Sequence, residues 1–222
     1  MTKFFNSAMA ALLISSTSIF AQVENDTEKP NSNPPISIET MAGSRGVMYQ
    51  LIINKKFQSI PLGFFSVTNA AATWEKEMTP DIMTQAHLTY TLFKGLDISS
   101  GMQYTPVYGF RSVAGLIYSY VSPQMLIIVN PKVDLADDLA AESLALIEYR
   151  PKINDKLNFY SRLQGMYGFI PKSGIHNRSY IMLRAGLGYK EFAFGAASNI
   201  DWYGPIKHNE NNFGVFVSAL LF

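Results

Sequence analysis

The fold is decided by one stretch, Asn212-Phe213-Gly214-Val215-Phe216-Val217-Ser218-Ala219-Leu220-Leu221-Phe222. Successive side chains of a β-strand point to opposite faces, so counting back by twos from Phe222 collects one face. That face carries Leu220, Ser218, Phe216 and Gly214. The last residues of a globular domain usually fray. Here the sequence instead predicts a hydrophobic strand that runs to an aromatic residue.

This pattern resembles the terminal strand by which the outer-membrane assembly machinery recognises β-barrels. The resemblance implies an assembly signal made of Phe222, Leu220 and Phe216, a series that Ser218 interrupts. A soluble β-sandwich can end in the same way. The choice between the two therefore depends on the rest of the chain.

Length, charge and cysteine content narrow the class of protein. The 222 residues suit one β-domain of ordinary size. A net charge of +1 gives no basic patch, so we expect no nucleic-acid partner. Cysteine is absent, which excludes disulfides, thiolate catalysis, cysteine metal sites and the cysteine anchor of a bacterial lipoprotein.

The first residues have the features of a secretory signal peptide over 1–21. Lys3 supplies the positive charge, Ala8–Ile14 form the apolar stretch, and Ala21 is a small residue suited to cleavage. The next segment, 22–35, reads QVENDTEKPNSNPP and predicts a flexible polar leader.

After the signal, no apolar run approaches the ~18 residues that a spanning helix needs. The longest uninterrupted run is Met125–Val129. Only helices and closed barrels satisfy their backbone in lipid. An exported chain of this kind is therefore expected to be either soluble or a membrane β-barrel.

Residues 36–222 read as strands of about ten residues separated by turn residues. In Met83–Leu92, the face with Leu88 and Tyr90 is apolar and the face with Gln85 and His87 is polar. The same alternation continues to the terminal strand. In a soluble sandwich the apolar face forms the core, whereas in a membrane barrel it meets lipid.

Three features favour the barrel. The polar faces hold small residues and isolated charges, and charged residues make up only 16% of the chain. Aromatic residues gather near the two sets of strand ends, as membrane interfaces select. The main members of these two belts are Trp74, Tyr108, Tyr167 and Trp202 at one end, and Tyr149 and Tyr189 at the other.

Connection lengths supply the third feature. Short turns alternate with longer connections, and the short ones all fall on the side predicted to be periplasmic. The fold class is therefore all-β, an up-and-down antiparallel transmembrane barrel of about 12 strands, or 10 if the first two segments form a leader or plug. Residues 70–72 are expected to hold a bulge, and Asp134–Leu146 also fits an amphipathic helical turn.

Most of 36–222 thus resembles Gram-negative outer-membrane β-barrel proteins as a class. The resemblance points to no characterised family, so no catalytic or ligand residues are carried over. It implies a place in the bacterial outer membrane, contact with lipid and lipopolysaccharide, and insertion by the barrel assembly machinery. It makes no prediction of oligomeric state.

The predicted lumen holds the polar residues that bear most on function. We expect these residues to line it: Gln85, His87, Glu148, Arg162, Arg184 and Asp201. Charged residues there can sort solutes by sign, or can neutralise one another and hold the barrel rigid. Both interpretations remain open at this point.

Signals for chemistry are weak. His176, Ser179 and Asp201 can be grouped as a hydrolase site near the outer rim, but no nucleophile-elbow motif supports them. The acidic loop with Asp134, Asp137, Asp138 and Glu142 is more typical of a solvated loop than of a divalent-cation site. We expect no cofactor, no metal centre and no enzyme activity.

Three functions follow, in order of preference. The first is a small outer-membrane pore for small polar solutes. The second is a closed structural or surface-interaction barrel that acts through its outer loops. The third is an enzyme that modifies outer-leaflet lipids.

Overall fold

The structure is a computed structural model that describes residues 33–75, 81–136 and 138–222. The predicted signal peptide and all but the last three residues of the predicted leader lie outside the described residues. Asn33, within that leader, bonds through its side-chain amide to the backbone N–H and C=O of Lys56.

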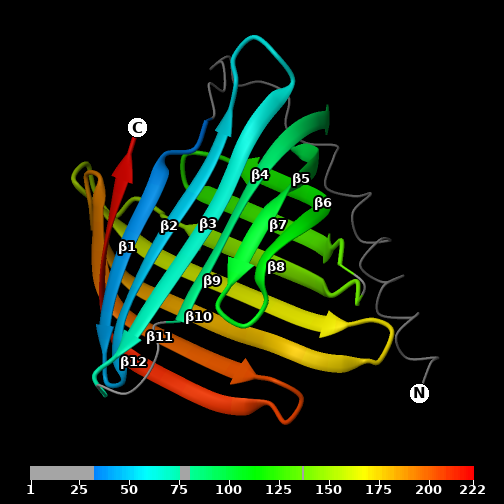
Figure 1. The fold of residues 1–222 in the computed structure, drawn as a ribbon. Coiled ribbons are helices and arrows are strands. Elements are labelled where there is room, and N and C mark those ends of the chain that lie inside the picture. Colours follow the sequence, from blue (N-terminus) through cyan, green and yellow to red (C-terminus); the bar gives the residue numbers. More distant parts are fainter. Residues whose placement is uncertain (1–32, 76–80, 137) are drawn as a thin grey trace, which may run out of the picture. The chain divides into compact units, whose positions relative to one another are not determined.

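Twelve antiparallel strands form a single closed sheet (Figure 1). They are β1 (Ile36–Gly43), β2 (Gly46–Lys56), β3 (Leu62–Thr73), β4 (Asp81–Phe93), β5 (Leu96–Thr105), β6 (Gly109–Val121), β7 (Met125–Asp134), β8 (Ala141–Tyr149), β9 (Leu157–Ile170), β10 (Ile175–Tyr189), β11 (Phe192–Tyr203) and β12 (His208–Leu221). Among the described residues no helix is long and apolar enough to cross a membrane.

Each strand pairs with the strands before and after it in the sequence, and β1 pairs with β12 to close the barrel. The closing ladder runs from Ile36 opposite Leu221 to Gly43 opposite Gly214. In Figure 1 these two strands, blue and red, lie side by side. The predicted up-and-down barrel is confirmed with twelve strands, so the ten-strand alternative is wrong.

The barrel has two ends, which we call the terminal rim and the distal rim. The terminal rim is where Ile36 and Leu221 pair, and it carries the connections 57–61, 94–95, 122–124, 150–156 and 190–191. The distal rim carries the described connecting residues 44–45, 74–75, 106–108, 135–136, 138–140, 171–174 and 204–207. The predicted contrast in connection length does not hold throughout, because the terminal rim also carries the long connection 150–156 and the distal rim the short connection 44–45. In addition, β10 and β12 extend into segments expected to be loops.

Two local expectations are wrong. Residues 70–72 hold no bulge, because the ladder of β3 with β2 continues through them without a register shift and the ladder with β4 stays in register to its end at Ala71. The predicted helical turn after Asp134 is absent from the described residues, since β7 runs to Asp134 and β8 begins at Ala141. The sheet does shift register between Thr91 and Phe93 and between His176 and Arg178.

The two walls of the barrel differ sharply in chemistry. In β4, Gln85, His87 and Thr89 are buried, while Leu88 and Tyr90 on the other face are exposed. Within the described strands, every Asp, Glu, Lys and Arg except Lys55 occupies an inward-facing position. A polar inside and an apolar outside are what a membrane barrel requires.

The outer wall presents large apolar side chains to its surroundings around the whole sheet. Exposed members from different strands include Leu88, Ile98, Leu116, Ile147, Leu163, Leu183, Phe194, Val215 and Val217. The inside is not purely polar. Buried Met41, Met166, Tyr160 and Phe216 pack in one internal cluster, and Phe65, Ile117 and Leu146 belong to a second.

Candidate functional site

A buried ionic cluster crosses the inside of the barrel. Oε1 of Glu39 on β1 is 2.7 Å from Nη2 of Arg162 on β9 and 2.8 Å from Nε of Arg184 on β10. Because β1 bonds only to β2 and β12, both ion pairs must span the interior. All three side chains are at most 2% exposed. We call these three residues the central cluster.

The central cluster contains one more positive than negative charge. Arg184 is held in place by carbonyl groups as well as by Glu39. Its Nη1 donates to the backbone oxygens of Leu183 and Ser198, at 2.9 and 3.1 Å, and to Oδ1 of Asn199 at 2.8 Å. Buried charge is costly without such partners. The extra positive charge of Arg184 is therefore held by carbonyl groups of the barrel wall as well as by Glu39.

Glu148, another predicted lumen residue, lies on the cross-strand partner position of Arg162. Its carboxylate is 2.7 Å from Nη2 of Arg150 and accepts a 2.8 Å hydrogen bond from the hydroxyl of Tyr160. The ring of Tyr160 packs against Phe216 at 5.4 Å between centroids. Glu148 is thus paired and fixed rather than facing an open space alone.

Gln85 and His87 form a second group with Lys132 on β7. Lys132 bonds to Oε1 of Gln85 and is 2.8 Å from a carboxylate oxygen of Glu142. Nε2 of His87 lies 3.3 Å from the same Gln85 oxygen, and its ring meets Phe65 edge-on. His87 is fully buried, in agreement with the hydrogen-bonded structural role that is the more common one for a lone histidine.

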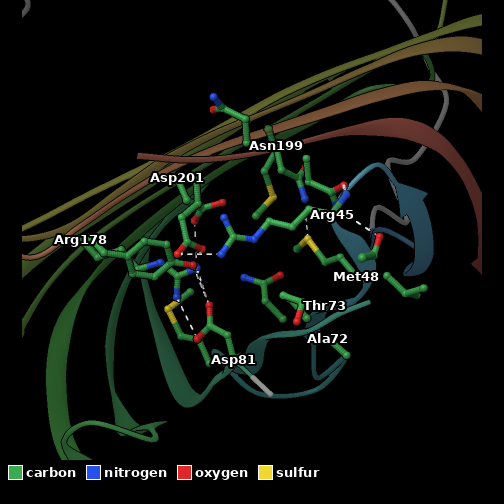
Figure 2. A pocket seen from close by; sticks show the side chains of 18 residues that line it. Arg45, Met48, Ala72, Thr73, Asp81, Arg178, Asn199 and Asp201 are labelled. Atoms are coloured by element: carbon green, nitrogen blue, oxygen red, sulfur yellow. Dashed lines mark hydrogen bonds and ion pairs between the residues drawn. The ribbon is translucent and has the colours of Figure 1, made fainter. Parts of the chain in front are cut away.

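At the distal rim the interior opens into a pocket of about 100 Å³. Figure 2 shows Arg178, Asp201 and Asp81 converging on one side of this pocket from β10, β11 and β4. Nη2 of Arg178 is 2.8 Å from Asp81 and 2.9 Å from Asp201, and it also donates to the hydroxyl of Tyr203. We call this pocket, with Arg178 and its two carboxylates, the distal pocket.

The rest of the distal pocket combines polar and thioether groups. Arg45 is paired with Glu210 at 2.8 Å, and Met48, Met83 and Met182 contribute apolar lining. A second, smaller cavity of about 20 Å³ lies beside Arg111 and Lys132. Both cavities reach the distal end of the interior rather than the terminal end.

The terminal end of the interior is also bridged. Lys56 on β2 bonds to Asp97 on β5 and, at 3.1 Å, to Thr91 on β4. The Asn54 amide donates to the Ser119 hydroxyl of β6 at 2.9 Å. Contacts between non-neighbouring strands thus cross the barrel near the terminal rim, at the central cluster and at the distal pocket.

The acidic loop does not present a free set of carboxylates. Nη1 of Arg111 is 2.7 Å from Asp134 and 2.9 Å from Asp138, and Glu142 is paired with Lys132. Asp137 lies outside the described residues. Among the described residues no group of three His, Cys, Asp or Glu is placed to hold a metal ion.

His176 and Ser179 do meet, but Asp201 does not join them. Nε2 of His176 is 3.0 Å from Oγ of Ser179. Asp201 faces inward and is paired with Arg178. The grouping of these three residues is therefore wrong for Asp201, because its strand turns the carboxylate to the opposite wall.

The residues predicted as aromatic belts lie near the two rims. Tyr149 and Tyr189 are exposed near the terminal rim, and Trp74, Tyr108 and Tyr167 are exposed near the distal rim. Trp202 is partly buried and pairs across strands with Ser179.

The face that ends at Phe222 is the inner one. Phe216 and Ser218 are both buried, Leu220 is partly buried, and Phe222 lies beyond β12 and is 89% exposed. Ser218 interrupts the apolar series because it faces the interior. The continuous apolar series towards lipid belongs to the other face, with Val215 and Val217.

Sequence reasoning missed Glu39, Lys132 and Arg178 as interior residues. The alternation of Ser37 and Glu39 with Ile36 and Ile38 could have placed Glu39 on the polar face. No local pattern could have named its arginine partners, because they come from β9 and β10, which are not neighbours of β1 in the sheet.

The closed sheet, apolar outer wall and charged interior define the class: a transmembrane up-and-down β-barrel of the outer-membrane type. No protein-family model and no curated protein matches the chain. Solved structures that it resembles include two porins, NanC and KdgM. NanC porin has 10% identity and a TM-score of 0.48, with 84% of this chain and 100% of that chain covered.

KdgM porin in complex with a disordered oligogalacturonate has 12% identity and a TM-score of 0.45, covering 82% of this chain and 98% of that one. OpdL of Pseudomonas aeruginosa has 12% identity and a TM-score of 0.39, covering 79% and 68%. The function proposed below rests on the residues of this chain.

Proposed function

We propose that the protein is a narrow channel of the bacterial outer membrane for small polar solutes. The observation that carries this proposal is the distribution of charge. In the described strands every charged residue except Lys55 lies on the inner wall, while the outer wall is apolar. An apolar wall suits lipid, and a polar inner wall suits hydrated solutes.

The distal pocket is the entrance in this proposal. Its volume of about 100 Å³ admits several water molecules or one small solute. Arg178 with its two carboxylates presents both signs of charge to what enters. The distal rim faces the outside of the cell, and the terminal rim faces the periplasm.

The central cluster is the constriction. Its two arginines outnumber its single carboxylate, and Arg150 and Glu148 beside it balance each other. A ring of fixed charge favours solutes of the opposite sign. The channel should therefore prefer small anions to small cations.

The sequence supports a route by which the protein reaches the outer membrane. The signal peptide over 1–21 directs export and is cleaved, and the barrel assembly machinery inserts the strands. Lipid and lipopolysaccharide then surround the outer wall, with the aromatic belts at the two interfaces.

The test is electrical. The mature chain, folded in detergent, would be added to a planar lipid bilayer under an applied voltage. A channel gives stepwise insertions with ohmic conductance and a reversal potential that favours chloride in a potassium chloride gradient. Bilayers that stay silent with folded protein would contradict the proposal.

A closed barrel is the second candidate, and a specific observation favours it. Cross-barrel contacts occupy three levels of the interior, and buried Met41, Tyr160 and Phe216 pack between them. Such a barrel would act through its distal connections. It predicts silent bilayers together with a cellular phenotype when the connections 171–174 or 204–207 are trimmed.

A further inference from the structure

Ser179 and His176 lie on the outer wall at the distal rim, in a geometry that the channel does not use. Nε2 of His176 is 3.0 Å from the Ser179 hydroxyl oxygen, and Nδ1 is 2.7 Å from the backbone oxygen of Gly204. A carbonyl oxygen can only accept, so Nδ1 must carry the proton. In the neutral ring Nε2 is then bare and accepts the hydrogen bond from Ser179.

This is the arrangement that activates a serine. A nucleophile needs a base within hydrogen-bond reach, and the base needs a third group that fixes its orientation and tautomer. Gly204 supplies the third group here. It comes from the connection between β11 and β12, so two segments of the distal rim, β10 and this connection, build the arrangement.

A β-bulge is what brings the two side chains together. Residues 176 and 179 would face opposite walls in a regular strand, because faces alternate. Arg178 pairs with Gly168 but His176 pairs with Phe169, so Asn177 is an extra residue in β10. Such bulges re-aim side chains and are frequent beside active sites. The bulge turns His176 to the outer wall, where its ring contacts that of Tyr167 at 5.6 Å.

The level of Ser179 along the barrel axis indicates which part of a membrane lipid its hydroxyl would contact. It pairs across strands with Tyr167 on β9 and Trp202 on β11, both predicted members of the distal aromatic belt. Aromatic belts lie at the level of the lipid headgroups. The ester bonds that join acyl chains to membrane lipids lie close to this level, so they would come within reach of the serine hydroxyl.

We propose that Ser179 and His176 form an acyl-transfer site on the outer wall that cleaves ester-linked acyl chains of outer-leaflet lipids. Ser179 Oγ attacks the ester carbonyl carbon while its proton passes to His176 Nε2. The ester C–O bond breaks, and the same proton passes to the leaving alkoxide, which departs as a lysolipid alcohol. The acyl group stays on Ser179.

Water completes the cycle. It attacks the acyl-serine carbonyl and gives its proton to His176 Nε2, and that proton returns to Ser179 as the fatty acid leaves. A backbone carbonyl supports the imidazolium less strongly than a carboxylate does. Turnover should therefore be slow, which makes covalent labelling a more sensitive readout than product release.

The experiment uses the purified full barrel in detergent and a fluorophosphonate probe, with the labelled peptide located by mass spectrometry. Ser179 should be labelled. S179A should abolish the label, and H176Q should slow it by about 100-fold or more. S161A is the matched control, since Ser161 also faces outward on β9 but donates its hydrogen bond to the Tyr149 carbonyl; the labelling of Ser179 in this variant should be unchanged.

Electrophoretic mobility before and after heating would confirm that each variant is folded. A folded wild-type barrel without label at Ser179, or one labelled equally fast in H176Q, would overturn the acyl-transfer site. Mixed micelles of phosphatidylethanolamine should release fatty acid and lysolipid with the wild type and not with S179A. Labelling without that release would overturn the lipid substrate. None of these outcomes depends on conductance.

Discussion

The inner and outer walls of this barrel are two faces of the same twelve strands, yet they are stabilised in opposite ways. The outer wall needs no partners within the protein, because large apolar side chains such as Leu163 and Leu183 are suited to lipid. The inner wall holds the charges, and those of the central cluster pair across the interior between strands that are not neighbours in the sheet. An alternating sequence thus specifies two surfaces with different requirements.

The comparison shows where a change in sequence should matter. A charge is tolerated inside only with a partner, and it is not tolerated outside in the middle of the membrane. The predictions below test each half of this statement, beginning with the largest effect.

Replacing Glu39 with alanine should be the most damaging change. It leaves Arg162 and Arg184 buried without their shared carboxylate. Breaking a buried ion pair in this way costs about 3–5 kcal/mol. Denaturant unfolding of the barrel in lipid vesicles would measure the loss in the free energy of unfolding.

Glu210→Ala is the matched control, since Glu210 pairs with Arg45 at the distal rim where both side chains are partly exposed. Its cost should be about 0–1 kcal/mol. Equal losses for the two variants would show that burial of the central cluster does not set its strength.

A charge on the outer wall should come next. Leu183 faces outward near the middle of β10 and pairs with Leu163. Leu183→Arg should lower the free energy of unfolding by about 2–4 kcal/mol, the cost of arginine at the membrane midplane. Ile206→Arg, in a distal connection where the side chain is 88% exposed, should change it little. If both variants unfold alike, the outer wall does not face lipid.

Arg178→Ala tests the inner wall at the distal pocket, where the charged side chains are less buried than in the central cluster. Asp81 and Asp201 lose their shared cation but keep access to the distal pocket. The loss in stability should be about 1–2 kcal/mol. Because a positive charge leaves the entrance, the reversal potential should move towards cations. An unchanged reversal potential would place the distal pocket off the path of the solute.

Removing Phe222 should have the smallest effect on the folded barrel. Its side chain is 89% exposed and lies beyond β12, so the free energy of unfolding should change by less than about 0.5 kcal/mol. In cells the same deletion should reduce the amount of barrel in the outer membrane, since Phe222 belongs to the proposed assembly signal. Normal outer-membrane levels would contradict that role.

Much of the fold could be predicted because alternation is local. The faces of Gln85, His87 and Leu88 follow from neighbouring residues, and so do most strand boundaries. The central cluster could not be predicted, because its hydrogen-bonded partners are separated by 123 and 145 residues. Their meeting depends on the register of every ladder between them.

The pair of His176 and Ser179 also depends on strand pairing, which a local sequence pattern does not reveal. The sequence indicates that both residues are chemically competent, yet their spacing of three predicts opposite faces. Only the bulge at Asn177, which is set by pairing with β9, brings them together. Asp201 was grouped with them for its type, and the alternation of β11 directs it inward instead.

The proposal that the inner wall forms a channel constricted by the central cluster is tested most directly by the reversal potential of Arg184→Ala. This change leaves Glu39 and Arg162 as a balanced pair and removes the bulk of one arginine from the interior. In planar bilayers with a potassium chloride gradient, the variant should conduct more than the wild type and lose most of its preference for chloride. A folded variant with the conductance and reversal potential of the wild type would contradict the account.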